Sequence, residues 1–123
     1  MSAINVAKET LENKTLKAAL LPVARYLVDG AISTGADVAV LTKATAGAYT
    51  LAAPTALQEG KQIRITSDTA AAHVVTATTL LEDGVTGGLK TTATFAAFKG
   101  ASLSLIAIGL RWHVLGKNAV TIT

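Results

Sequence analysis

Apolar and polar residues alternate in short runs along most of the chain after residue 30, and this period of two predicts β-strands. In KQIRIT (61–66), for example, Ile63 and Ile65 fall on one face and the polar residues fall on the other. Comparable runs are VAVLTK (38–43), AYTLA (48–52), HVVTATTL (73–80), TATFAA (92–97), SLSLIAI (102–108), RWHVLG (111–116) and AVTIT (119–123). Strands at this spacing predict an all-β fold of about eight short strands, built as a sandwich of jelly-roll type or as a Greek-key barrel.

Two stretches of the chain, 48–66 and 93–107, share one outline. Each contains an alternating run that ends in Ala-Ala, then a short polar connector with a glycine, then a second alternating run. Gly60 and Gly100 hold equivalent places in the two connectors. We interpret the stretches as two hairpin-like units, which indicates duplicated β-structure.

Two dipeptides are turn signals. Asp29-Gly30 follows the β-branched and aromatic run VARYLV and predicts a turn there. Gly109-Leu110 lies between two alternating runs and predicts a tight connection between them.

The first 29 residues differ from the rest, because they contain no glycine and little alternation. The segment KETLENKTLKAALL (8–21) has good helix formers, and Pro22 would end such a helix. Its leucines do not form a clean stripe, so a short helix and an extended arm both remain open. The sequence therefore predicts an N-terminal arm or helix over 1–29 and a β-domain over 30–123.

Composition adds that the chain is apolar but has few large side chains. Hydrophobic residues make up 50% of the 123 residues, charged residues 15% and aromatic residues 4%. Small side chains bury little area each, at about 25 cal/mol per Å², so a core built from them is weak. We therefore expect other chains, in the first place copies in a dimer or trimer, to cover part of this apolar surface.

Membranes and nucleic acids are not expected as partners. The longest apolar runs, LSLIAIGL and AALLPVARYLV, are too short or are interrupted by Pro22 and Arg25, and the N-terminus does not read as a secretory signal. The net charge of +3 comes from lysines and arginines that are spread along the chain, without the cluster typical of nucleic-acid binders.

Candidate chemistry is sparse. The two histidines, His73 and His113, occur in apolar strand runs without metal-ligand spacing, which favours a strand-surface or hydrogen-bonded buried histidine over a metal site. No GxSxG nucleophile elbow and no cysteine occurs. We therefore predict no catalytic residues, no metal and no cofactor, with a small hydrolase of dispersed residues as a remote alternative.

Two segments carry a resemblance to a known group of proteins. They are AGAYTLAAPTALQEGKQIRITSDTAAAHVVTATTLL and TTATFAAFKGASLSLIAIGLRWHVLG. Within them, the motifs are a Leu-Ala-Ala-Pro turn (51–54), a Gly-Lys-hydrophobic strand (60–65), Ala-His-Val-Val-Thr (72–76) and a final strand with Trp and Val (112–114). In these features the chain resembles small β-structured virion proteins of tailed bacteriophages over about residues 30–116.

The resemblance implies a virion structural protein, most like a capsid decoration (cement) protein. Such proteins sit on the capsid exterior as dimers or trimers, and the implied partner is the major capsid protein. A phage tail or fibre attachment component is the main alternative. A carbohydrate-binding module is disfavoured because aromatic residues are few.

Residues for the expected interfaces come from two places. The segment from Leu16 to Tyr26 is the candidate docking arm, and aromatic residues are preferred as interface anchors. The candidate interface residues are Leu16, Leu20, Leu21, Val23, Tyr26, Tyr49, Phe98 and Trp112. Tyr49 is equally consistent with a place in the core.

Overall fold

The computed structural model describes residues 23–123, which form ten β-strands and one short 3-10 helix. This confirms the predicted all-β fold class. The strands are β1 (Val23–Tyr26), β2 (Gly30–Ile32), β3 (Val38–Leu41), β4 (Ala48–Leu51), β5 (Gln62–Ser67), β6 (Val74–Glu82), β7 (Lys90–Phe95), β8 (Ser102–Ile108), β9 (Arg111–Asn118) and β10 (Val120–Ile122), and the helix η1 (Ala56–Gln58) lies between β4 and β5.

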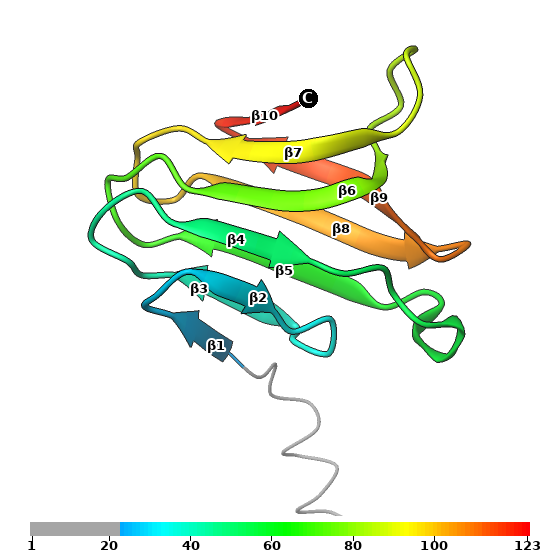
Figure 1. Ribbon diagram of the computed structural model, residues 1–123, viewed down its shortest axis with the longest axis horizontal. Coiled ribbons are helices and arrows are strands. Elements are labelled where there is room, and N and C mark those ends of the chain that lie inside the picture. The colour runs from blue at the N-terminus through cyan, green and yellow to red at the C-terminus, as the bar shows by residue number, and fades with distance from the viewer. Residues whose placement is uncertain (1–22) are drawn as a thin grey trace, which may run out of the picture.

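The strands form two layers that face each other across one core (Figure 1). One layer has the order β1-β3-β5-β8-β9 and the other has the order β2-β4-β6-β7-β10. The layers join where β6 pairs with β9, at Leu81–Trp112 and Glu82–His113. The opposite side stays open, because β1 and β2 each pair with a single strand. The result is a nearly closed, barrel-like sandwich.

The first six strands wind around the core as a coil. β1, β3 and β5 pair in parallel in one layer, and β2, β4 and β6 pair in parallel in the other. Each odd-numbered strand is therefore followed by a strand in the opposite layer. The last four strands close the fold by antiparallel pairing of β7 with β6, β8 with β5, β9 with β8, and β10 with β7.

The prediction that 48–66 and 93–107 are hairpin-like units is wrong. β4 does not pair with β5, and β7 does not pair with β8, because each connector carries the chain from one layer to the other. Both strands of a unit then turn an apolar face toward the same core from opposite sides. The second strands of the two units pair with each other, with Ile63 opposite Leu105 and Ile65 opposite Leu103.

The predicted glycine turns are confirmed in their backbone geometry. Gly60 and Gly100, the equivalent glycines of the two connectors, have φ of 83° and 89°. Gly109 and Leu110 have φ of 60° and 63°, and they form the two-residue connection between the antiparallel strands β8 and β9. Positive φ at both central residues is the geometry that matches the right-handed twist of a hairpin.

Two further residues with positive φ lie where the chain changes partners. Thr79, with φ of 52°, lies in the irregular part of β6 between Thr76 and Leu81, after which β6 begins to pair with β9. Ala119, with φ of 58°, lies between β9 in one layer and β10 in the other. Local bulges and left-handed residues of this kind turn the corners that bring the two layers together.

The core is built from the alternate residues of each strand that face inward. Its largest fully buried side chains are Trp112, Tyr49 and Phe95, and most of the remainder are Leu, Ile, Val and Ala. The indole Nε1 of Trp112 donates a hydrogen bond to the carbonyl of Ala52 at 2.9 Å, so the one polar atom of this side chain has a partner.

The helix or arm predicted over 1–29 lies largely outside the described residues, as do Leu16, Leu20 and Leu21. Within the described part, β-structure begins at Val23, ahead of the boundary predicted at residue 30, because β1 pairs with β3. The connectors define two ends of the sandwich. The His73 end comprises residues 27–29, 42–47, 68–73 and 96–101, and the Leu57 end comprises residues 33–37, 52–61, 83–89 and 109–110.

Candidate interaction surfaces

Two of the predicted interface anchors are core residues, and this prediction is corrected. Trp112 is 0% exposed and Tyr49 is 1% exposed, so neither side chain has surface to offer a partner. Alternation explains the result, because each lies between outward-facing neighbours on its strand. His113 is only partly buried, on the outer face next to Trp112, as its position in an alternating strand predicts.

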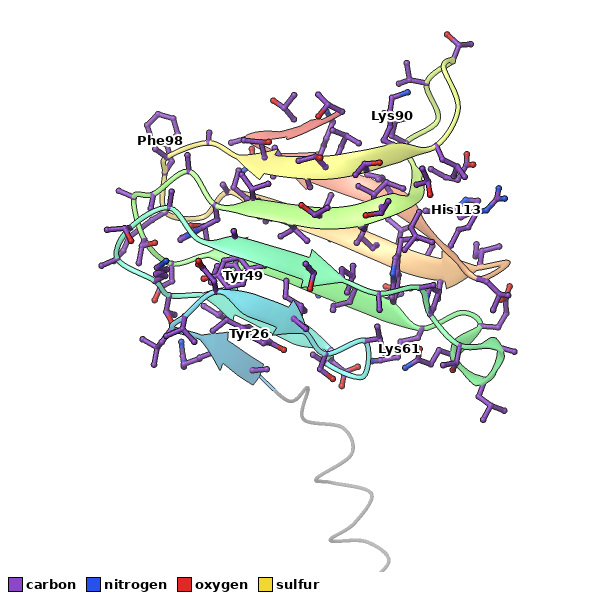
Figure 2. The ribbon with its side chains drawn as sticks, viewed as in Figure 1. Tyr26, Tyr49, Lys61, Lys90, Phe98 and His113 are labelled. Carbon is purple, nitrogen blue, oxygen red and sulfur yellow. The ribbon has the colours of Figure 1, made fainter. Side chains whose placement is uncertain are left out.

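The other described candidates retain some exposed surface. Phe98 is 68% exposed on the connector between β7 and β8, where Figure 2 shows it pointing away from the body of the protein. Val23 is 53% exposed at the start of β1. Tyr26 is partly buried: its hydroxyl accepts a hydrogen bond from the Ser33 amide at 2.9 Å, and its ring meets the ring of Tyr49 edge-on at 6.3 Å.

The most exposed of the large apolar side chains was missed by the sequence reasoning. Leu57, in η1, is 99% exposed. The helix is held by a reciprocal pair of contacts between Thr55 and Gln58, in which the Thr55 amide donates to the Gln58 side chain at 2.9 Å. A capping box of Thr-x-x-Gln directly after Pro54 is the sequence signal that marks this turn.

Leu57 belongs to a group of exposed apolar residues at the Leu57 end. The carboxylate of Glu59 accepts a hydrogen bond from the Gly109 amide, at 3.0 Å for Oε2, which fixes the η1 connector to the β8–β9 turn. That turn exposes Leu110, and the end of β8 exposes Ile108. At the His73 end, Leu27 and Val28 are exposed as well as Phe98.

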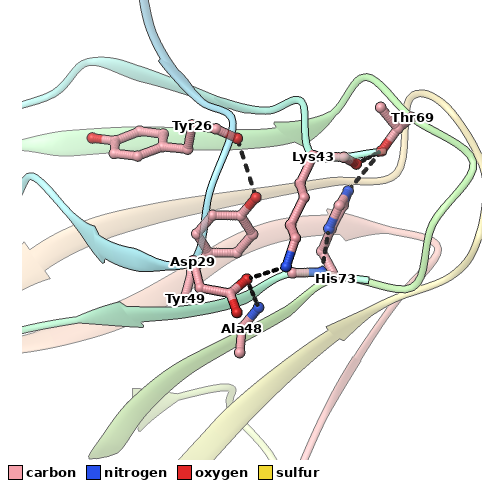
Figure 3. Close-up of polar contacts among 8 residues, drawn as sticks. Tyr26, Asp29, Lys43, Ala48, Tyr49, Thr69 and His73 are labelled. Atoms are coloured by element: carbon pink, nitrogen blue, oxygen red, sulfur yellow. Dashed lines mark hydrogen bonds and ion pairs between the residues drawn. The ribbon is translucent and has the colours of Figure 1, made fainter. Parts of the chain in front are cut away.

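A buried polar cluster holds the connectors of the His73 end together (Figure 3). His73 is fully buried, and its Nδ1 accepts a hydrogen bond from the Gly47 amide at 2.9 Å. Its Nε2 lies 2.7 Å from the Thr69 hydroxyl, which itself donates to the Lys43 carbonyl at 2.8 Å. Because Nδ1 accepts a hydrogen bond, it carries no proton, and His73 is neutral. The Thr69 hydroxyl gives its own proton to Lys43, so it accepts from His73, which carries its proton on Nε2.

The surroundings of His73 oppose a positive charge. Burial lowers the pKa of His73 below its ordinary value, and the positive charge of Lys43 lowers it further. Both ring nitrogens are occupied by structural contacts. His73 is therefore the hydrogen-bonded buried histidine that the sequence favoured over a metal ligand, and its nitrogens are not free to act as a general base.

Asp29 extends this cluster to the surface. Its Oδ1 accepts hydrogen bonds from Lys43 Nζ at 2.8 Å and from the Ala48 amide at 3.0 Å. The bond from Lys43, followed by that from Ala48, lowers the pKa of Asp29. The residue that sequence reasoning singled out as a turn signal thus ties the β1–β2 corner to the β3–β4 connector.

Tyr49 packs against the same cluster. Its ring meets His73 edge-on at 5.8 Å, its hydroxyl donates to the Tyr26 carbonyl at 3.1 Å, and burial raises its pKa. Gly47 lies directly on the ring, since a Cβ at this position would stand 2.5 Å from a Tyr49 ring carbon. The cluster is therefore closely packed and has a structural role.

The outer faces of the two layers differ in charge. The outer face of β1-β3-β5-β8-β9 carries charged residues, and we call it the charged face. Its charged and polar members by register include Arg25, Gln62, Arg64 and His113. The outer face of β2-β4-β6-β7 and β10 has none in its centre, and we call it the threonine face. Two cross-strand rows define it: Ala31, Thr50, Thr76 and Thr92, and Ala48, Val74, Thr94 and Thr121.

A shallow groove of about 400 Å³ lies at the edge of the charged face, lined by Asp37, Lys61, Gln62 and Arg64. Lys61 Nζ pairs with Asp37 Oδ1 at 2.6 Å across it. The ion pair occupies two of the three charged groups in the lining, and Arg64 is the third. The groove thus has the chemistry of a surface ion pair.

The part of the chain that the structure describes contains neither a metal-binding cluster nor a membrane-spanning helix. Between residues 23 and 123, His, Asp and Glu side chains do not gather in threes as a metal ion would require. No helix within the same range has the length and apolar character needed to cross a membrane.

Comparison with protein-family models finds none that matches this chain, and comparison with curated proteins finds no match either.

Proposed function

We propose that the protein is a capsid decoration protein of a tailed bacteriophage, which binds the capsid exterior as a homo-oligomer and stabilises the shell. The observation that carries the proposal is the group of large apolar side chains that stand exposed on the connectors. Leu57, Leu110, Phe98, Leu27 and Val28 are all more than half exposed. These large side chains bury less than half of their surface against the protein itself, so we assign them to contacts with other chains.

The energetics of such contacts suit a repeated lattice. Burying one Leu or Phe side chain contributes about 1.5–3 kcal/mol, so a few of them give a modest affinity per copy. Many copies on one shell add avidity without strong single contacts. Because the protein binds the assembled shell and not separated subunits, its occupancy raises the resistance of the shell to heat by mass action.

The resemblance of residues 30–116 to small phage virion proteins supports the same proposal. The segment from Leu16 to Tyr26 remains the candidate docking arm. Its described part supports this role through Val23, which is exposed at the start of an edge strand. β1 begins at Val23, so an arm that holds the shell would be anchored in the β-domain through β1.

The test is a binding experiment with undecorated shells of the phage that encodes the protein. Purified protein is added, and the number of bound copies and the temperature at which the shell loses its contents are measured. We expect saturable binding and a higher temperature. A protein that does not bind these shells, at any concentration tried, would end the proposal.

Two variants identify the end that faces the shell. Phe98→Ser removes the largest apolar contact of the His73 end, and Leu57→Ser removes that of the Leu57 end. We expect one of them to lower the affinity about tenfold or more, which is 1.4 kcal/mol, and the other to bind normally. Leu115→Ser, which changes an exposed apolar residue on β9 that lies at neither end, is the matched control. Deletion of residues 1–22 should weaken attachment and leave the β-fold intact, and unchanged affinity would remove the arm from the proposal.

A tail or fibre attachment component is the second candidate. The observation in its favour is the open side of the sandwich, where β1 and β2 are both edge strands at the start of a parallel coil. Edges of this kind allow a strand of another chain to pair alongside them. An elongated trimer in solution, together with absence of shell binding, would favour this candidate over decoration.

A further inference from the structure

From the contrast between the two outer faces, we infer that the threonine face binds a second copy of the same face, so that the protein forms a two-fold symmetric dimer through β4, β6 and β7. The inference rests on the homo-oligomeric part of the proposed function and does not depend on a capsid as the partner.

The first argument is the absence of charge at the centre of the face. Its two cross-strand rows contain five threonines, two alanines and one valine, and they run across β2, β4, β6, β7 and, in one row, β10. The centres of protein interfaces are depleted of charged residues in the same way. A solvent-exposed face of a monomer has no such requirement, and the opposite face of this molecule carries Arg25 and Arg64.

The second argument is the distribution of charge around the face. Asp29 and Lys43 form an ion pair beside Ala48, Lys117 lies beside Thr94 and Thr121, and Lys90 is the first residue of β7. The face therefore has a charged border around an uncharged centre. This arrangement matches an interface core with a polar rim.

The third argument identifies the occupant. A partner with charged groups would have to leave them desolvated against a surface without a counter-charge, which is costly. A threonine hydroxyl both donates and accepts a hydrogen bond, so two copies of this face can satisfy each other's hydroxyls across a two-fold axis. The charged face cannot pair with itself in this way, because Arg25 and Arg64 would repel their copies.

The size of the face agrees with a weak dimer. Its five strands have five residues on average, and at about 4.8 Å between strands and about 3.3 Å per residue they give a footprint of roughly 24 Å by 17 Å, or about 400 Å². The border connectors add to this footprint. A standard interface buries about 800 Å² per partner, so the strand face is about half that size and fits a weak association.

The test measures the oligomeric state of the full-length protein by sedimentation equilibrium over a wide range of concentration. The variant Thr76→Lys places a charge at the centre of the threonine face. Thr66→Lys is the matched control, because Thr66 is a partly buried strand residue on the charged face. We expect Thr76→Lys to raise the dimer dissociation constant about 100-fold or more, and Thr66→Lys to change it less than threefold.

A second set of variants separates a broken interface from a damaged fold. Thr50→Lys tests the next position of the same row on β4, where the side chain is exposed. Mixing Thr76→Lys with Thr76→Glu should restore association, which misfolded protein would not do. A wild-type protein that stays monomeric up to its solubility limit overturns the inference. So does an oligomer that survives Thr76→Lys and Thr50→Lys, or one that dissociates with Thr66→Lys. Shell binding is measured separately, so failure of the dimer and failure of the proposed function remain distinguishable.

Discussion

The two ends of the sandwich are held together by different kinds of contact. At the His73 end, the connectors meet around a fully buried histidine, and hydrogen bonds join residues 26 or more positions apart, such as Gly47 with His73 and Thr69 with Lys43. At the Leu57 end, most ties are exposed or partly buried contacts, such as Glu59 with the Gly109 amide, although the buried Trp112 also holds the Ala52 carbonyl. A buried polar contact is costly to break, whereas an exposed one is not. The difference indicates that side chains of the His73 end are needed for the stability of the fold, whereas those of the Leu57 end can be substituted at little cost.

The variant His73→Leu should have the largest effect on this comparison. It removes the acceptor of the Gly47 amide and the partner of the Thr69 hydroxyl, and each unsatisfied buried group costs about 1–3 kcal/mol. We expect the free energy of unfolding to fall by about 2–5 kcal/mol in urea denaturation. Glu59→Gln, the matched change at the Leu57 end, should cost less than about 0.5 kcal/mol. Equal losses would show that the two ends do not differ.

Gly47→Ala should have the next largest effect. The added methyl group would overlap the Tyr49 ring, which is held between Tyr26 and His73 and cannot swing away. Overpacking of this kind costs about 1–3 kcal/mol, and thermal unfolding should show it. Gly35→Ala at the Leu57 end is the control, since its Cβ would make an ordinary contact with the Ser33 hydroxyl.

Acid should weaken the His73 end first. The pKa of His73 is lowered in the folded protein, so its contribution to stability is complete above the ordinary value of 6.5. As the pH falls below 6.5, the unfolded chain takes up a proton that the folded protein resists, and the free energy of unfolding drops by at most about 1.4 kcal/mol per pH unit. His73→Gln should flatten this slope. Asp29, whose pKa is also lowered, contributes stability that is present above 3.8 and is lost at lower pH. Denaturation at a series of pH values measures both windows, and a slope near pH 6 that survives His73→Gln would contradict the assignment.

The Leu57 end should tolerate, and even gain from, substitution at its strained turn. Leu110 has φ of 63°, a conformation that costs a residue with a side chain about 1–2 kcal/mol and costs glycine very little. We expect Leu110→Gly to raise the free energy of unfolding by about 0.5–1 kcal/mol, after the greater chain entropy of glycine is subtracted. Lower stability would show that the Leu110 side chain packs on the folded protein. A leucine at a position whose backbone conformation suits glycine is consistent with a contact between the Leu110 side chain and another chain.

The smallest effect is expected for Leu57→Ser. Because the side chain is almost completely exposed, the free energy of unfolding should change by less than about 0.5 kcal/mol in the same denaturation experiment. A larger loss would mean that Leu57 supports the fold, and it would then no longer be available as a contact residue. The two ends would then not differ in how much their side chains contribute to stability.

The elements of the fold were predictable from local sequence, and their pairing was not. Alternation identified strands such as β5 and β8 because the period of two is a local property. Which strands pair, and in which layer each strand lies, depends on residues far apart in the chain. This is why the units at 48–66 and 93–107 looked like hairpins. The same outline in both units does carry a structural meaning, since the two second strands, β5 and β8, lie side by side.

The candidate surfaces were less predictable than the strands. Aromatic type suggested Tyr49 and Trp112 as anchors, but burial follows strand position and not residue type, so only Phe98, on a connector, is largely exposed. Leu57 escaped notice because a leucine in a polar connector has no periodic pattern around it. The threonine face escaped notice for a different reason: its members are spaced normally along each strand, and they form a surface only after the sheet register brings them together.

The coil of the first six strands has a consequence for how the chain folds as it is synthesised. None of the first five strands pairs with the strand that follows it, so every ladder among the first six strands must wait for the strand two places later. The first two-residue hairpin, β8–β9, comes close to the C-terminus and also covers the exposed edge of β5. Closing long loops before any local pairing is slow. We expect the nascent chain to form its first ladder between consecutive strands only at β6 and β7, and to close the sandwich when β8 and β9 emerge and cover the edge of β5.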